Sequence, residues 1–153
     1  MAARLRALIL PAILVGLQPE KAIPVTPETM LRVISIGLAG LAGTLARYWL
    51  SGLIARRFGE TFPTGTLVVN VVGCFLAGFL AYSLFERFLV SETSRTMVMI
   101  GFLGGFTTFS SFGLQSFNLL RDGEVTLALL NIGLSNIAGL LMIWLGFTVA
   151  KIL

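Results

Sequence analysis

The residues with the clearest chemistry lie in one charge-free stretch, positions 101–112, which reads GFLGGFTTFSSF. Adjacent glycines and a cluster of hydroxyl residues favour interruption of a helix, and non-helical backbone within a membrane is tolerated only where protein buries it or where it lines a cavity. We expect Gly104–Gly105 to break the helix and Thr107–Thr108 to cap its restart. The stretch therefore predicts a binding site or a permeation path.

The two sides of such a break offer opposite chemistry. Freed carbonyl groups coordinate a small hard cation, whereas backbone N–H groups at a helix N-terminus hold an anion. Phe109 and Phe112 are three residues apart and share a helical face, where their positive ring edges suit a small dehydrated anion. Ser110 and Ser111 add hydroxyl donors. The alternative is that both rings simply face lipid or neighbouring helices.

Other polar side chains interrupt the remaining apolar runs. Asn70, at the head of a seam of small residues, either bonds a neighbouring helix or presents N–H groups to a permeating anion. Arg47 is either an interfacial anchor or a cation facing an aqueous vestibule, where it attracts anions. Asn131 and Ser135 share a face and either hold helices together or wet a pore. The sequence leaves each of these alternatives open.

These groups must be positioned by membrane-spanning helices. Only 12% of the 153 residues are charged and 56% are hydrophobic, whereas soluble domains carry about 25% charged residues. A span needs about 20 apolar residues, and four charge-poor segments meet that requirement: 30–55, 61–85, 96–120 and 125–150. We therefore predict an all-α integral membrane protein with four transmembrane helices, the third of them broken in mid-membrane.

The distribution of ionisable groups excludes several functions. The chain has no histidine, and its seven acidic residues lie in the N-terminal tail or near the ends of the spans. Proton-coupled transport and hydrolytic catalysis both need an ionisable or metal-binding group at the site. No nucleic-acid-binding motif is recognisable either. Passive transport or a structural role remains, and we expect neither enzyme activity nor a nucleic-acid partner.

Residues 1–29 differ from the four-helix membrane domain at 30–153. Two arginines precede an apolar stretch and three prolines, which predicts an interfacial helix with a proline-rich linker or, alternatively, a targeting segment. Without this extension the basic residues on the two sides of the spans are nearly balanced, so the domain's charges permit insertion either way up. One side holds Arg4, Arg6, Lys21, Arg32, Arg87, Arg95 and Lys151, and the other holds Arg56, Arg57 and Arg121.

Three ordered motifs allow comparison with known families: Gly40-x-x-Gly43-x-x-x-Arg47-Tyr48, Pro63-x-Gly65-Thr66-Leu67-x-x-Asn70-x-x-Gly73, and the stretch at 101–112. Together they resemble the Fluc (CrcB) family of fluoride ion channels, over about residues 31–150. The resemblance implies an antiparallel, dual-topology dimer, formed with a second copy or a paralogue in the inner or plasma membrane. It also implies two narrow fluoride pathways, and a structural sodium ion (Na+) at the dimer interface, held by the backbone carbonyl groups of Gly104 and Thr107.

The function that the resemblance implies is passive, selective export of cytoplasmic fluoride, which reduces fluoride toxicity. Phe109 and Phe112 would be the paired aromatic residues of the pathway. Asn70 would supply its amide and Ser110 a hydroxyl group, while Arg47 matches the family's first-helix arginine at the vestibule. The alternatives are a non-conducting or partner-dependent subunit of a heterodimeric channel, and a small four-helix exporter, which would need a buried carboxylate for proton exchange.

The chain departs from the family pattern at two places. Gln115 stands where the family often has a glutamate, and Gly139 and Ile143 fall where its fourth helix usually carries a serine and a threonine. One explanation is a heterodimer in which only some pores conduct. The other is that Ser135 and Asn136 supply the polar groups instead.

Overall fold

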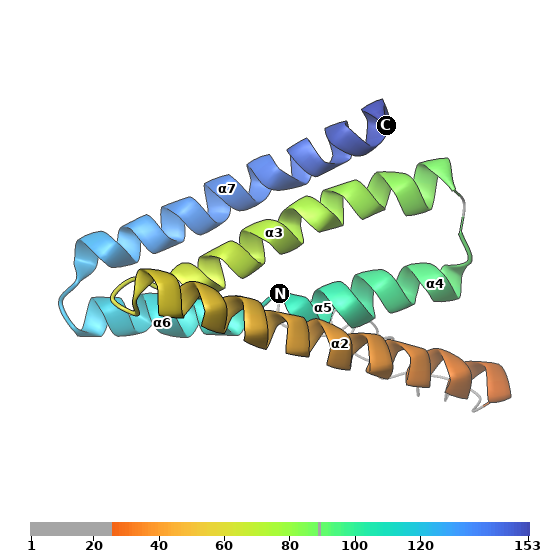
Figure 1. Cartoon of the computed structure of the whole chain (residues 1–153), viewed down its shortest axis with the longest axis horizontal. Coiled ribbons are helices and arrows are strands. Elements are labelled where there is room, and N and C mark those ends of the chain that lie inside the picture. Colours follow the sequence, from red (N-terminus) through yellow and green to blue (C-terminus); the bar gives the residue numbers. More distant parts are fainter. Residues whose placement is uncertain (1–25, 89) are drawn as a thin grey trace, which may run out of the picture. The chain divides into compact units, whose positions relative to one another are not determined.

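Helices make up nearly all of the part of the chain that the structure describes. The computed structural model describes residues 26–88 and 90–153. Four helical segments are long and apolar enough to cross a membrane: Pro27–Phe58, Thr64–Arg87, Glu92–Arg121 and Val125–Ile152 (Figure 1). The prediction of an all-α protein with four such segments is therefore confirmed. The predicted interfacial helix or targeting segment lies outside the described residues.

Each predicted span corresponds to one or more helical elements. The first and fourth are single helices, α2 (Pro27–Phe58) and α7 (Val125–Ile152). The second is α3 (Thr64–Ala81), continued by a π-helical segment, Tyr82–Arg87. The third comprises α4 (Glu92–Thr96), a π-helical segment (Met97–Leu103), α5 (Gly104–Phe106) and α6 (Phe109–Arg121).

Local signals explain the helix ends. α2 starts at Pro27, three residues before the predicted span, because proline suits the first helical turn and the Thr26 hydroxyl accepts a hydrogen bond from the Thr29 N–H at 3.2 Å. After α6, Gly123 has a φ of +82°, the left-handed conformation that favours glycine. The sequence Asp122–Gly123, a pair typical of turns, therefore forms the turn between α6 and α7.

Within residues 31–153 the four spans alternate in direction (Figure 1). α3 and α7 lie side by side and run the same way, and a Cβ on Gly78 would collide with the backbone of Ile143. α2 meets the third span in the same manner, because a Cβ on Gly43 would collide with the Phe102 carbonyl. Small residues therefore let the helix backbones approach closely, as membrane helices without a hydrophobic driving force require.

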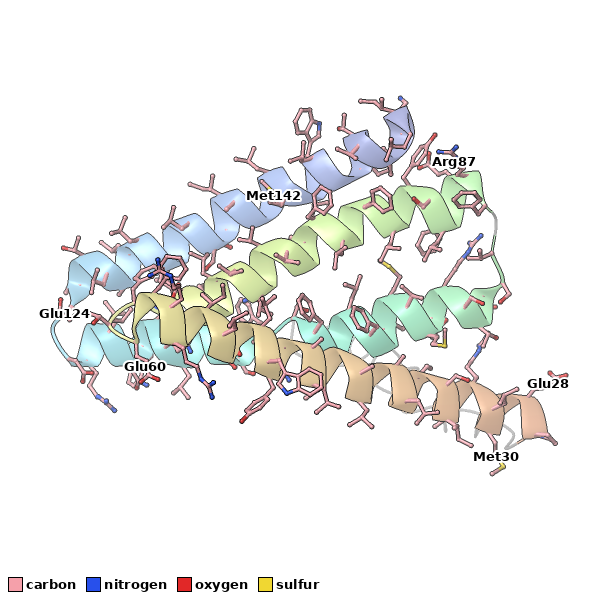
Figure 2. The ribbon with its side chains drawn as sticks, in the orientation of Figure 1. Glu28, Met30, Glu60, Arg87, Glu124 and Met142 are labelled. Carbon is pink, nitrogen blue, oxygen red and sulfur yellow. The ribbon has the colours of Figure 1, made fainter. Side chains whose placement is uncertain are left out.

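Apolar side chains cover the outer faces of these helices (Figure 2). Leu140 and Trp144 on α7, for example, are 71% and 66% exposed. Charged side chains lie at the two ends, with Glu60 and Glu124 at one and Arg87 at the other. An exposed apolar band between charged ends suits hydrocarbon rather than water. The chain is therefore a multi-pass membrane protein.

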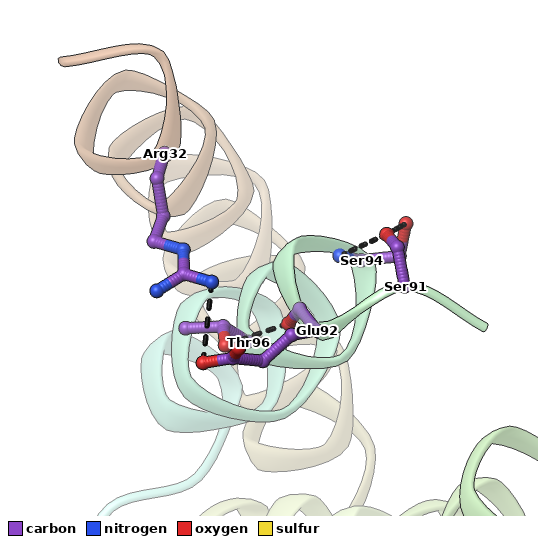
Figure 3. Close-up of polar contacts among 5 residues, drawn as sticks. All are labelled: Arg32, Ser91, Glu92, Ser94 and Thr96. Carbon is purple, nitrogen blue, oxygen red and sulfur yellow. Dashed lines mark hydrogen bonds and ion pairs between the residues drawn. The ribbon is translucent and has the colours of Figure 1, made fainter. Parts of the chain in front are cut away.

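An ion pair joins the first and third spans near one end (Figure 3). Arg32 Nη2 on α2 lies 3.2 Å from Glu92 Oε1 on α4. Beside it, the Ser91 hydroxyl accepts a hydrogen bond from the Ser94 N–H, and the Thr96 hydroxyl donates to the Glu92 carbonyl. Because the Glu92 carboxylate is largely exposed, the pair adds little stability and mainly orients the two helix ends.

The third span keeps its helical geometry further than the sequence predicts. Gly104 and Gly105 are helical, so the prediction that they break the helix is wrong. A Cβ on Gly105 would collide with the Gly40 carbonyl on α2, so this glycine serves close packing between the spans. Helical geometry ends after Phe106.

The contact between α3 and α7 predicts different effects for two glycine substitutions in α7. Gly146→Ala places a Cβ against the Phe75 carbonyl and 2.9 Å from the Phe79 nitrogen. We expect this overpacking to destabilise the fold by about 1–3 kcal/mol. Gly133→Ala is the control, because a Cβ there meets nothing within 4 Å, and better helix propensity should stabilise it by up to about 1 kcal/mol. Thermal unfolding in detergent compares them, and equal stability of the two variants would contradict the packing.

Candidate functional site

Two residues leave helical geometry between α5 and α6. Thr107 has a ψ of 160°, and Thr108 has a φ of −151° and a ψ of 114°, so both are extended. The Thr107 hydroxyl bonds back to the Leu103 carbonyl at 2.9 Å. The Thr108 hydroxyl accepts a hydrogen bond from the Ser111 N–H at 3.2 Å and caps α6. The predicted capping role of Thr108 is therefore confirmed.

The side chain of Asn70, on α3, binds both backbone groups of Thr108. Its Nδ2 donates to the Thr108 carbonyl at 3.0 Å, and its Oδ1 accepts from the Thr108 N–H at 2.8 Å. An extended residue cannot pair these groups within a helix, and leaving them unpaired in an apolar environment costs several kcal/mol. Asn70 therefore bonds a neighbouring span, which was one of the two alternatives. Its second Nδ2 hydrogen is available to another acceptor.

The interruption removes the helical partners of several carbonyl groups, among them those of Gly104 and Thr107. In an α-helix, the carbonyl of residue i accepts from the N–H of residue i+4. The Thr108 N–H, which would pair with Gly104, donates to Asn70 instead. The Ser111 N–H, which would pair with Thr107, donates to the Thr108 hydroxyl. The two carbonyl groups that were predicted to hold a cation thus belong to the set without helical amide donors.

The oxygens of these carbonyl groups are suitable ligands for a small hard cation. Freed main-chain oxygens of unwound helices are known ligands for sodium in membrane proteins. Across residues 26–88 and 90–153, no three His, Cys, Asp or Glu side chains gather as an alternative metal site. Gly104 and Thr107 are too few ligands for a cation by themselves, so the remaining oxygens would come from outside this pair.

Arg47 extends from α2 toward the interruption. Its Nη1 donates to the Thr107 carbonyl at 3.4 Å. Arg47 lines a polar pocket of about 340 Å³ together with Gln115, whose Oε1 is buried and has no hydrogen-bond partner among the described residues. Ser51, Thr66 and Gln115 also line a pocket of about 510 Å³ that includes the α2–α3 connection. This polar lining favours the vestibule over the interfacial anchor as the role of Arg47.

Phe109 and Phe112 line a separate groove of about 400 Å³. Their ring centroids are 5.4 Å apart, with the ring planes tilted by 48°. Phe112 is 9% exposed, whereas Phe109 is 81% exposed, so one of the two rings is uncovered in the single chain. Asn70 lines the same groove. The structure therefore brings together three of the four residues predicted for the pathway.

The fourth predicted residue, Ser110, is not brought to this groove. It is exposed, and its hydroxyl lies 3.3 Å from that of Thr108. Two polar residues of α7 line the groove instead, Ser135 and Asn136. Ser135 Oγ is buried and, within the described part of the chain, has no hydrogen-bond partner. Ser135 is therefore a groove-lining residue whose hydroxyl is unpaired within the described part of the chain.

Gly139 and Ile143 take part in the contact between α3 and α7. A Cβ on Gly139 would lie 3.3 Å from the Cys74 sulfur, and the Ile143 backbone closes against Gly78. Both departures from the family pattern thus coincide with close helix packing. Ser135 and Asn136, the residues of the other alternative, both line the groove, and whether they supply its polar groups stays a prediction.

A buried chain of hydrogen bonds, which the sequence analysis missed, supports Phe112. Asn131 Nδ2 on α7 donates to Ser116 Oγ at 2.9 Å, and Ser116 Oγ donates to the Phe112 carbonyl at 2.8 Å. Asn131 is 2% exposed, so of its two alternatives the structure favours holding helices together. The spacing of four residues between Phe112 and Ser116 is the signal that identifies Ser116.

Comparison with known proteins agrees with this geometry. The model of a family described as CrcB-like protein, camphor resistance (CrcB), matches residues 34–147. A protein of Opitutus terrae named fluoride-specific ion channel FluC is 53% identical over 117 residues, which cover 75% of this chain and 89% of that protein. A protein of the same name from Geobacter sp. strain M21 is 43% identical over 124 residues, covering 81% of this chain and all of that protein (100%).

The two bonds between Asn70 and Thr108 predict a specific loss of stability. Asn70→Ala leaves the Thr108 peptide groups unpaired, so we expect destabilisation of about 1–3 kcal/mol and faster hydrogen exchange at the Thr108 amide. Asn136→Ala is the matched control, because among the described residues its exposed amide bonds only the Ile132 carbonyl of its own helix. Denaturation in detergent and amide exchange measure the two effects. Equal behaviour of both variants would refute the role assigned to Asn70.

Proposed function

Because the chain belongs to the CrcB-like family, we propose that it is a passive, fluoride-selective ion channel that lets cytoplasmic fluoride leave the cell. The observation that carries this proposal is the paired rings of Phe109 and Phe112 in a groove beside the Asn70 amide. Three relatives whose alignments cover 75%, 81% and 76% of this chain are named fluoride-specific ion channel FluC, the third being a protein of Methylocella silvestris that is 50% identical over 119 residues. The family is one of ion channels, so no catalytic residue is required.

The groove suits a small anion because its donors are weak and uncharged. The ring edges carry partial positive charge, the Asn70 amide has a free N–H, and Ser135 offers a hydroxyl group. Conduction requires binding that is favourable enough for entry and weak enough for exit. A cationic side chain in this groove, such as that of an arginine, would bind the anion too tightly for rapid release. Selectivity then comes from a narrow path that strips water from the ion.

Passive export is sufficient to protect the cell from accumulating fluoride. Fluoride enters from acidic surroundings as neutral HF and dissociates in the less acidic cytoplasm, where the anion accumulates. An open path down the electrochemical gradient lets that anion leave. We place the channel in the inner or plasma membrane, where such a gradient exists.

We further propose that the chain works as an antiparallel, dual-topology dimer, with its third helix interrupted at mid-membrane. The large exposure of Phe109 supports a partner that covers the open side of the groove. The near balance of basic residues at the two ends of the four-helix domain supports insertion in both orientations. Sodium would be held at the dimer interface by the carbonyl groups of Gly104 and Thr107, with the second subunit completing its ligands.

One observation keeps a second candidate function in view. Gly139 and Ile143 are apolar where the family usually has hydroxyl groups, so a partner-dependent subunit of a heterodimer is the alternative. A proton-coupled exporter is less compatible, because the acidic residues of the described chain all lie at the ends of the spans.

Fluoride efflux from liposomes that contain this chain alone separates the three possibilities. Fast release that does not depend on a proton gradient is the result expected for the channel. Release that requires a proton gradient would indicate an exporter. Correctly folded protein without any release would indicate a subunit that needs a paralogue.

The groove predicts that Phe109→Ile and Phe112→Ile each abolish fluoride efflux, because an aliphatic side chain has no positive edge to replace the water around the ion. We expect a loss of at least about 100-fold, of the order seen when a site loses an essential polar partner. Phe117→Ile is the control, since Phe117 is exposed on the same helix and does not line the groove. A fluoride electrode reports the efflux, and cross-linking verifies that each variant remains assembled. Wild-type efflux in both groove variants would disprove the pathway.

A further inference from the structure

Arg47 is a cation without a carboxylate partner inside the bundle. The two ion pairs of the described chain are Arg32–Glu92 and Arg121–Asp122, both near span ends. The acceptor recorded for Arg47 is a neutral carbonyl group, that of Thr107. A guanidinium has five N–H donors and keeps its charge in proteins. Arg47 therefore has N–H donors that its bond to Thr107 does not use.

The Thr107 carbonyl is the acceptor for Arg47 and also a proposed ligand for sodium. It has no helical partner, because the Ser111 N–H is bound to the Thr108 hydroxyl. It is one of the two oxygens assigned to sodium in the proposed function, on which this inference rests. A guanidinium and a sodium ion close to one carbonyl oxygen repel each other, and such repulsion is strong where little water screens it. The two cations are therefore competitors for Thr107.

A second acceptor for Arg47 lies in its own pocket. Gln115 lines the same pocket of about 340 Å³, and its Oε1 is buried without a hydrogen-bond partner. An unpaired buried carbonyl oxygen is unfavourable, so Gln115 gains a bond if the guanidinium turns toward it. Gln115 Oε1 is thus a candidate second acceptor for Arg47, besides the Thr107 carbonyl at the break in the third span.

We propose that Arg47 is a two-position switch that sets the sodium affinity of this protein. Without sodium, the guanidinium binds the Thr107 carbonyl. With sodium bound, the guanidinium leaves that oxygen and binds Gln115 Oε1, and its remaining N–H donors are available to an anion in the vestibule pocket. Sodium binding and anion attraction are then coupled through one side chain, and the coupling is reciprocal.

The test measures the sodium concentration that gives half-maximal thermal stabilisation of the purified full-length protein in detergent, with choline chloride holding ionic strength constant. Arg47→Gln removes the competitor, so the midpoint should fall by about fivefold or more, consistent with loss of a nearby unit charge. Gln115→Leu removes the second acceptor, so its midpoint should rise. In the double variant, Gln115→Leu should change the midpoint no further, since its effect acts through Arg47.

Controls separate this switch from general effects of charge and folding. Arg32→Gln removes the same charge from the same helix at its Glu92 ion pair and should leave the midpoint unchanged. If Arg47→Gln does not fold, the side-chain nitrogen resonances of Arg47 in the wild-type protein, assigned with Arg47→Lys, should shift with sodium at the thermal midpoint. An unchanged midpoint in Arg47→Gln, or Arg47 resonances indifferent to sodium, overturns the proposal.

Failure of this inference is distinguishable from failure of the proposed function. If sodium does not change the stability of the wild-type protein, both the cation site and the switch are refuted. Fluoride efflux from liposomes, measured on the same preparation, reports the channel independently. Efflux that persists without any sodium response refutes the switch and leaves the channel in place.

Discussion

The structure depends on the pairing of one side-chain amide with one peptide unit. Asn70 donates to the carbonyl of Thr108 and accepts from its N–H, as a neighbouring strand would in a sheet. Within a membrane no water replaces these hydrogen bonds, so without Asn70 the Thr108 backbone would adopt helical geometry to pair its N–H and carbonyl groups. The interruption of the third span is therefore maintained from α3 and not by the flexibility of the third span itself.

The rest of the site follows from this pairing. Because Thr108 is held in an extended conformation, its hydroxyl is free to cap α6, and the rings of Phe109 and Phe112 emerge from the first turn of that helix. On the other side of the break, Gly104 and Thr107 keep carbonyl groups without helical donors. A single local departure from helical geometry thus accounts both for the unpaired carbonyl groups and for the position of the paired rings.

Close helix packing fixes the positions of these groups. α3 and α7 approach until the backbone of Ile143 blocks any side chain at Gly78, and α2 meets the third span at Gly43. Such contacts leave little freedom for the helices to slide, since interiors of this density do not deform continuously. They also bring Gly139 on α7 close to Cys74 on α3, so that a larger residue at position 139 would require the Cys74 side chain to move.

The sequence by itself determined the four membrane spans, the turn at Gly123 and the cap at Thr108. It also identified the polar and aromatic residues that are candidates for the site. Those features depend on transfer of about 20 consecutive side chains into lipid or on the conformation of a few neighbouring residues. Only the tertiary structure decided that Gly105 packs rather than breaks the helix, that Asn70 pairs with Thr108, and that Arg47 reaches Thr107. The physical reason is distance along the chain. These bonds join residues 38 and 60 positions apart, so their partners are set by how the helices pack and not by local preference.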